Sequence, residues 1–248
     1  MHWVITLILL IVFLAGLVRY QFWRPRRPAH WPRLLMYHSV SPDQEDGMNI
    51  SPRRIERHLV VMKRLGYRFV TVSELRDLWE QGVREPMVAL TFDDGFANNY
   101  QYLFPLLKKH HIKATIYLAT QIEGIAALSQ QQIKEMHASG LIEFGAHTCH
   151  HVNLLLMQDE QAKREIEQSV QAVREMVGQC RTFSYPYGRF DERHVAMVAA
   201  TGCDTAVTVK KAIAEPSQRW LVLPRIGIHG KTDALQLYVA LTRGKYRF

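Results

Sequence analysis

The segment Val88-Ala-Leu-Thr-Phe-Asp-Asp-Gly95 ends a short apolar run with two adjacent carboxylates and a glycine. A buried strand is predicted over residues 88–92, and neighbouring side chains of a regular strand point to opposite faces. Gly95 has the conformational freedom that lets the chain leave the strand at this point. Asp93 and Asp94 can then converge on one site, one as a metal ligand and the other as a base. A solvated turn is the alternative interpretation.

Short apolar runs alternate with helical patterns on both sides of this segment. We predict strands over residues 34–40, 69–72, 88–92, 114–119, 142–146, 182–185, 205–209 and 222–228. Helices are predicted over residues 52–65, 74–81, 98–110, 130–139, 159–177, 192–200 and 233–241. This alternation is typical of parallel strands joined by crossover helices. It predicts an α/β fold, a distorted (β/α) barrel of about seven parallel strands, with an open doubly wound sheet as the alternative.

A second polar segment, Phe144-Gly-Ala-His-Thr-Cys-His-His-Val-Asn-Leu154, also follows an apolar strand. Catalytic residues of such barrels lie where the strands end. His147 and His151 are four residues apart, and neutral imidazoles suit zinc and related divalent metals. His150 is a competing ligand, and a surface histidine cluster without a metal is the alternative.

A third segment, Thr182-Phe-Ser-Tyr-Pro-Tyr-Gly188, contains a proline that fixes its own φ and a glycine that permits a tight turn. This shape can direct a backbone N–H, such as that of Tyr187, into a pocket. An ordinary aromatic turn is the alternative.

Together these motifs resemble the NodB-type polysaccharide deacetylases (carbohydrate esterase family 4). The resemblance rests on Thr91-Phe-Asp-Asp-Gly95, on His147-Thr-Cys-His-His151 with Asn153-Leu154, and on Tyr185-Pro-Tyr-Gly188. We assign residues 34–248 to a NodB-like domain. Leu35-Met-Tyr-His-Ser39 is similar to the branch that deacetylates poly-N-acetylglucosamine exopolysaccharides. The resemblance implies a hydrolase that releases acetate from an N-acetylated polysaccharide or lipid-linked glycan by cleaving a carbon–nitrogen bond other than a peptide bond.

The resemblance also implies roles for individual residues. Asp93 is the general base, and Asp94, His147 and His151 hold a divalent metal, with zinc as the first choice and cobalt, nickel or iron as alternatives. The N–H of Tyr187 helps to form the oxyanion hole.

The sequence departs from the family pattern at two places. Ser184-Tyr185 stands where the family has an arginine, so the arginine that orients the base must come from elsewhere, and Arg225 is the candidate. The general acid is either His38 or His229, and His38 is preferred because it matches the exopolysaccharide branch. The other histidines in helical patterns are predicted to lie at the surface: His58, His110, His111, His137 and His194.

Two other classes of protein fit parts of this pattern. A non-catalytic, membrane-tethered glycan-binding domain would be expected to have lost Asp93 or a metal ligand, and these residues are all present. A non-haem iron oxygenase also uses two histidines and one carboxylate. It requires a site for an O₂-linked cosubstrate, for which the sequence has no signal.

The N-terminal segment is predicted to be a membrane anchor. Residues 3–18 are uncharged and apolar, and the first basic residues follow at Arg19 and in the Pro/Arg-rich linker 24–33. We therefore predict a single transmembrane helix within residues 1–23, rather than a cleaved signal peptide, because no basic residue precedes the apolar run. The protein is expected at a bacterial-type inner membrane, and the positive-inside rule favours the cytoplasmic face for the catalytic domain.

Charge and cysteine content exclude some further functions. The chain has 31 Lys plus Arg and 23 Asp plus Glu, a net charge of +8, but five of the arginines lie within residues 19–33. The remainder is only mildly basic, so no nucleic-acid partner is predicted. Cys149, Cys180 and Cys203 form no CxxC pair, so a disulfide framework is not expected.

Overall fold

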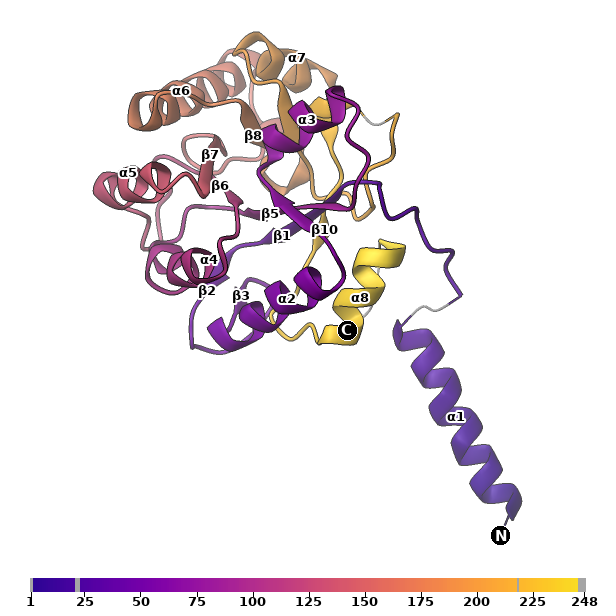
Figure 1. The fold of residues 1–248 in the computed structure, drawn as a ribbon. Coiled ribbons are helices and arrows are strands. Elements are labelled where there is room, and N and C mark those ends of the chain that lie inside the picture. The colour runs from indigo at the N-terminus through magenta and orange to yellow at the C-terminus, as the bar shows by residue number, and fades with distance from the viewer. Residues whose placement is uncertain (1, 21–22, 218, 245–248) are drawn as a thin grey trace.

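The structure is a computed structural model that describes residues 2–20, 23–217 and 219–244. Residues 1, 21–22, 218 and 245–248 lie outside the described residues, and with them parts of the predicted anchor and the last residues of the predicted NodB-like domain. Within the described part of the chain, helices surround a central sheet, and one long helix projects away from the body (Figure 1).

The central sheet is parallel throughout, as the β-α alternation predicts. Seven strands form a continuous path in the order β10-β1-β5-β6-β7-β8-β9, and β4 pairs beside β5. Their bounds are β1 Arg33–Tyr37, β4 Arg68–Val70, β5 Met87–Phe92, β6 Ala114–Leu118, β7 Ile142–Ala146, β8 Thr182–Ser184, β9 Thr205–Val207 and β10 Ile226–Gly227. β2 Ser39–Val40 and β3 Asn49–Ile50 form a separate two-stranded sheet, and β3 was not predicted.

One short segment links the two ends of the sheet. Leu223 forms an isolated parallel bridge with Val207 of β9, and Ile226 pairs with Leu35 of β1. The chain between them, which contains Arg225, therefore runs from one end of the strand path to the other. This closure supports the predicted distorted barrel over an open doubly wound sheet.

The predicted helices are present with small shifts at their ends. They are α2 Pro52–Arg64, α3 Val72–Glu80, α4 Phe104–His110, α5 Gln130–Ala138, α6 Asp159–Val177, α7 Glu192–Ala200 and α8 Ala234–Arg243. The predicted helix 98–110 begins as a π-helical turn, Asn99–Leu103, ahead of α4. Single turns of 3₁₀ helix also occur at Leu154–Leu156, Pro186–Gly188 and Trp220–Val222.

The central strands are almost fully buried, which explains why they are apolar runs in the sequence. All six residues of β5 are buried, and the five residues of β6 are too. A parallel sheet covered by helices leaves neither face in water, so its strands lack polar alternation. The hydrophobic core is continuous from β1 through the strands to the apolar sides of α2, α6 and α8.

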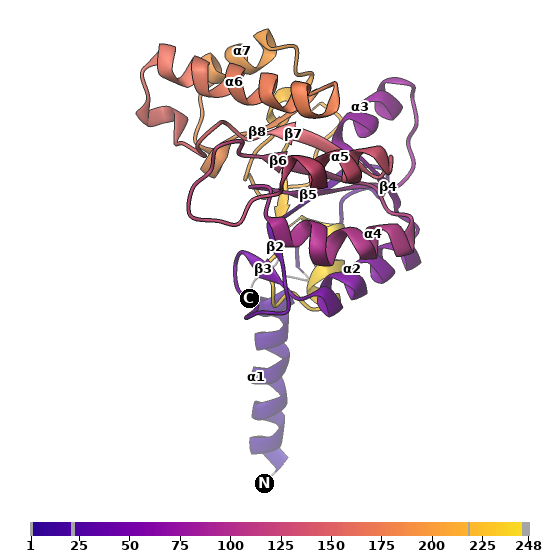
Figure 2. The ribbon, with the colours of Figure 1, turned by 90° about the vertical axis from the view of Figure 1, so that its left-hand side faces the viewer.

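The N-terminal helix is confirmed as α1 His2–Tyr20. Figure 2 shows that it extends away from the body, and its apolar side chains are exposed. Across the part of the chain that the structure describes, no helix is long and apolar enough to cross a membrane. The predicted transmembrane helix within residues 1–23 is therefore not supported.

Candidate active site

The two adjacent carboxylates at the end of β5 diverge because the backbone changes conformation between them. Asp94 has φ +74° and Gly95 has φ +76°. The left-handed conformation therefore begins at Asp94, one residue earlier than the sequence indicates. Gly95 also packs closely on β6, since an added Cβ would lie 2.8 Å from Leu118 Cδ2. This kink allows Asp93 and Asp94 to meet different partners.

Asp93 forms a bidentate, fully buried ion pair with Arg225. The distances are 2.6 Å from Nη1 to Oδ1 and 2.7 Å from Nη2 to Oδ2. The other guanidinium N–H groups are also engaged, because Nη1 donates to Thr91 Oγ1, Nη2 to Ser184 Oγ and Nε to the Thr208 carbonyl. All five donors of a guanidinium are thus satisfied. The planar fork fixes the orientation of the Asp93 carboxylate.

The ion pair keeps Asp93 ionised despite its burial. Burial raises the pKa of Asp93, but the charge and hydrogen bonds of Arg225 outweigh this effect and hold the pKa well below its usual range. A carboxylate that stays ionised while it is shielded from bulk water can accept a proton from a bound reactant.

Asp94, His147 and His151 form a compact set of ligand atoms. The Oδ1 atom of Asp94 lies 3.6 Å from His147 Nε2 and 3.4 Å from His151 Nε2, and all three ligand atoms lie within 4.8 Å of one another. The Nδ1 atoms face away: that of His147 lies 2.6 Å from the Ser184 carbonyl, and that of His151 lies 3.1 Å from the Tyr187 hydroxyl. These outer contacts leave both Nε2 atoms directed at the carboxylate, as expected for metal-binding histidines.

The protonation chemistry of the set also fits a divalent metal. Burial, followed by the nearby Asp93 carboxylate, raises the pKa of Asp94 to about 6. Burial lowers the pKa of His147 to about 3 and also lowers that of His151, so both imidazoles are neutral. Asp94 Oδ1 is buried and has no hydrogen-bond partner among the described residues. Such an oxygen is costly to bury unless a ligand engages it, so the donor set fits a cation.

A carboxylate on α6 holds the loop that carries the two histidines. Glu165 Oε2 accepts hydrogen bonds from the backbone N–H groups of Cys149 and His150, at 2.9 and 3.0 Å. Its Oε1 atom lies 2.7 Å from His150 Nδ1. His150 therefore contacts Glu165 rather than the ligand set, which resolves the competition with His147 and His151.

Tyr187 contributes its side chain as well as its predicted backbone group. The residue has φ +56° within the turn Pro186–Gly188, and its side chain is more than half exposed. Its ring packs edge-on against His151, with the centroids 4.5 Å apart. The backbone conformation is compatible with directing the Tyr187 N–H into the site, and that role remains a prediction. The hydroxyl contact with His151 was not predicted, because nothing in the sequence pairs the two residues.

The two candidate acids lie in different surroundings. His38 is half-buried directly after β1, and Tyr37, the residue before it, pairs with Phe92, the residue before Asp93. His229 follows β10, and its Nδ1 accepts a hydrogen bond from the Lys231 N–H at 3.1 Å; burial lowers the pKa of His229. His38 thus follows the strand next to β5, whereas His229 follows a strand that is two places away from β5.

The prediction that the other histidines lie at the surface is wrong for His58 and His194, which are each 1% exposed. His58 lies between Tyr37, whose hydroxyl is 3.3 Å from Nδ1, and the Thr232 carbonyl, 2.9 Å from Nε2. Burial lowers the pKa of His58 to about 4, so this histidine is a neutral structural link between α2 and β1.

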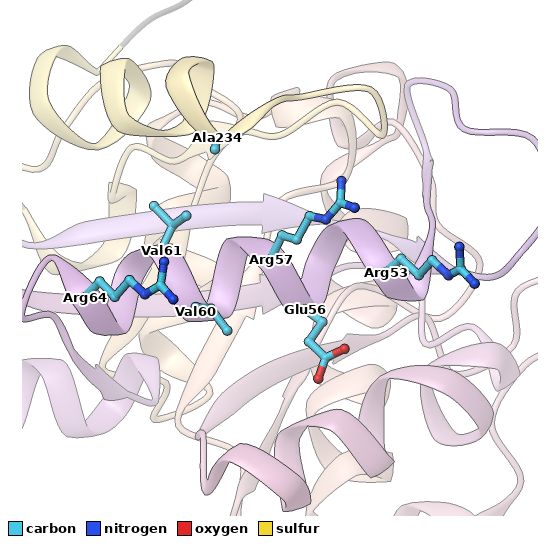
Figure 3. A pocket seen from close by; sticks show the side chains of 7 residues that line it. All are labelled: Arg53, Glu56, Arg57, Val60, Val61, Arg64 and Ala234. Carbon is cyan, nitrogen blue, oxygen red and sulfur yellow. The ribbon is translucent and has the colours of Figure 1, made fainter.

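A shallow opening adjoins the ligand set and is lined by His151, Asn153, Tyr187 and Arg189. A second hollow lies elsewhere, along α2 and beside the first residue of α8 (Figure 3). Figure 3 shows three arginines spread along that helix, Arg53, Arg57 and Arg64. This hollow contains none of the ligand set, so the opening beside His151 is the candidate substrate site.

A parallel β/α sheet that carries an Asp-His-His set beside a second, arginine-bound carboxylate has the residues that hydrolases use to hold a divalent metal and a base. Comparison with known proteins narrows this class. Residues 80–206 match the family described as polysaccharide deacetylase. YxkH of Bacillus subtilis, which is assigned to the same activity, is 32% identical over 209 residues, or 83% of this chain and 74% of that protein.

Two further relatives agree with this assignment. The poly-β-1,6-N-acetyl-D-glucosamine N-deacetylase of Staphylococcus aureus is 23% identical over 216 residues, or 81% of this chain and 74% of that enzyme. The structure of the Streptococcus pyogenes deacetylase PplD, solved in complex with acetate, superposes with a TM-score of 0.75 at 26% identity. That comparison covers 84% of this chain and 96% of PplD.

The chain belongs to the polysaccharide deacetylase family, the NodB-type family of carbohydrate esterase family 4. It is thus an enzyme, a hydrolase of carbon–nitrogen bonds other than peptide bonds, and the glycan-binding and oxygenase alternatives are not supported.

Proposed function

We propose that this enzyme uses a divalent metal to remove N-acetyl groups from a poly-N-acetylglucosamine-type polymer or a lipid-linked glycan, releasing acetate. The observation that carries the proposal is the Asp94–His147–His151 set beside the arginine-bound Asp93. Support for the glycan comes from the Staphylococcus aureus relative, a poly-β-1,6-N-acetyl-D-glucosamine N-deacetylase, and support for acetate as the product comes from the acetate bound to PplD.

Each residue of the site has a separate role in the proposed reaction. Asp94, His147 and His151 would hold a divalent metal, which would supply Lewis acidity at the acetyl carbonyl and make a water more acidic. Asp93 accepts the proton of the attacking water, because Arg225 keeps it charged and oriented. The N–H of Tyr187 donates to the oxygen on which negative charge develops. A histidine then protonates the departing amine, since an amide anion is too basic to leave.

Metal removal tests the proposal directly. Chelation is expected to abolish acetate release from N-acetylglucosamine oligomers, and added Zn²⁺ or Co²⁺ is expected to restore it, with nickel and iron as further metals to assay. Metal content is measured by elemental analysis in parallel with the assay. Full activity in a preparation shown to lack metal would contradict the proposal.

We propose His38 as the general acid, because it follows β1 at the level where Asp93 follows the neighbouring strand β5. His38→Ala is expected to lower kcat by about 10²–10⁴ and to remove the basic limb of the pH–rate profile, because the amine then leaves without a proton. His229→Ala serves as the matched control and is expected to remain near wild type. The opposite pattern would assign the role to His229.

We further propose that the N-terminal segment tethers the enzyme to a bacterial-type inner membrane with the catalytic domain on the cytoplasmic face. The support is the charge pattern, in which five arginines follow the apolar run within residues 19–33. In this location the substrate is a nascent or lipid-linked sugar at the membrane surface.

A pair of C-terminal fusions tests the orientation. A fluorescent reporter that folds inside the cell is expected to be bright, and a phosphatase reporter that is active only outside is expected to be inactive. High phosphatase activity with a dark fluorescent fusion would place the domain outside and favour an exported polymer as the substrate.

A further inference from the structure

Cys180 and Cys203 lie side by side just before β8 and β9. The two strands pair in parallel with Thr182 opposite Thr205, and each cysteine precedes its threonine by two residues. The Arg181 carbonyl accepts from the N–H groups of Asp204 and Thr205 at 2.9 and 3.2 Å, so the segments stay paired ahead of the strands. Because side chains two residues apart share a face, the cysteines point to the same side.

The two thiols are also in contact. Both residues are buried, and Cys203 Sγ lies 3.7 Å from the Cys180 carbonyl. The contact between the thiols raises the pKa of Cys180 and lowers that of Cys203.

The spacing of the strands matches a disulfide. Neighbouring strands lie about 4.7–4.9 Å apart, and the Cα atoms of disulfide-bonded cysteines lie about 4.4–6.8 Å apart. We propose that Cys180 and Cys203, which are free thiols in this structure, form a disulfide-bonding site that closes when the protein meets a disulfide oxidant. This site is independent of the deacetylase chemistry, and it departs from the expectation that the cysteines have no disulfide role.

The reaction with an oxidant such as oxidised glutathione balances in two exchanges. One cysteine of the pair loses its proton and attacks one sulfur of glutathione disulfide, which forms a mixed disulfide and releases one glutathione thiolate. The other cysteine loses its proton and attacks the protein sulfur of that mixed disulfide, which releases the second thiolate. Two protein thiols are oxidised, one oxidant disulfide is reduced to two thiols, and the two protons pass to the released thiolates.

The crosslink would join the two strands at the ends remote from the active site. β8 ends at Ser184, and Thr208 follows β9 directly; at these opposite ends, both residues accept hydrogen bonds from Arg225. A short link at the strand starts reduces the freedom of the unfolded chain without displacing these contacts. We therefore expect higher stability and unchanged kcat.

The test uses the full chain, incubated with oxidised glutathione, then unfolded in denaturant and alkylated. The number of alkylated thiols is expected to fall from three to one, with a Cys180–Cys203 peptide found by mass spectrometry. The apparent Tm is expected to rise by on the order of 5–10 °C. Cys149→Ser is the matched control and should still crosslink, whereas Cys180→Ser and Cys203→Ser should not.

Three results would overturn the proposal. Three alkylated thiols after oxidation would show that the pair does not close. A crosslink that contains Cys149 would assign the reactivity to another pair. A crosslinked protein with a lower Tm than the reduced form would show that the native spacing does not accommodate the bond.

Discussion

Asp93→Asn is expected to lower kcat by about 10³ while leaving the metal content near that of the wild type. The substitution removes the proton acceptor, but Asp93 is not among the three ligand atoms that face one another. The asparagine carbonyl still accepts a hydrogen bond from Arg225, but the buried guanidinium loses its counter-charge, so the free energy of unfolding is expected to fall as well. The loss of activity is expected in the chemical step and should not be rescued by added metal.

Asp94→Asn is the control for this experiment, because it makes the same chemical change at the neighbouring position. It removes the negative charge from a buried ligand atom and is expected to lower metal occupancy, with activity partly restored at high metal concentration. Elemental analysis and acetate release are measured on both variants, with circular dichroism as a check of folding. Equal loss of metal in the two variants would show that the roles of base and ligand have been divided wrongly.

The strands and the ligand set were predictable because their signals are local. β5 and β7 are short, mostly apolar and buried strands, and each polar group of the set follows one of them within a few residues. His147 and His151 lie in one loop, and Asp94 follows β5 directly. In a parallel sheet, the carboxyl ends of β5 and β7 lie at the same edge, and this is enough to bring Asp94 close to the two histidines.

Contacts between distant segments were harder to predict. Arg225 is 132 residues from Asp93 in sequence, and it reaches the site because its segment closes the barrel between β9 and β1. The only sequence feature that points to Arg225 is the absence of the family's arginine at Ser184-Tyr185. The contacts of Glu165 with His150 and of the Tyr187 hydroxyl with His151 could not be predicted from the sequence. A glutamate on a long polar helix and an exposed tyrosine are common and do not indicate a particular partner.

The burial of His58 could have been predicted from the spacing of the apolar residues in α2. Ile55, His58, Leu59 and Met62 are the buried positions of α2, and their spacing of three and four residues defines one face of a helix. His58 therefore occupies a core position of the same pattern that identified the helix. The surface prediction treats histidine as a polar residue that avoids the core. A neutral, hydrogen-bonded imidazole can nevertheless be buried at modest cost.

Arg225→Gln is expected to cause the largest combined loss of stability and activity. The wild-type guanidinium is fully buried and satisfies both oxygens of Asp93, so the variant leaves a buried carboxylate without its counter-charge. Breaking such a pair by removing one partner costs about 3–5 kcal/mol of unfolding free energy. Urea unfolding measures this loss, and acetate release is expected to fall because the base is no longer oriented.

The pH dependence separates this electrostatic effect from a loss of packing. In the wild type, Arg225 holds the pKa of Asp93 below its value in the unfolded chain, so the stabilisation is present above that value and is lost as the pH falls. In Arg225→Gln, burial dominates and the pKa of Asp93 rises, so the folded variant binds a proton more readily than the unfolded chain. The stability gap between wild type and variant should therefore be smaller at about pH 5 than at about pH 8.

The same shift should appear in catalysis. The acidic limb of the pH–rate profile is expected to move to higher pH in Arg225→Gln, because Asp93 acts as a base only when ionised. Arg219→Gln is the matched control, since Arg219 forms an exposed bidentate pair with Glu192 at 2.8 and 2.9 Å. An exposed pair contributes little, so this variant is expected to match the wild type in stability and in its pH profile. A pH-independent stability gap with an unmoved acidic limb would mean that Arg225 acts only by filling space.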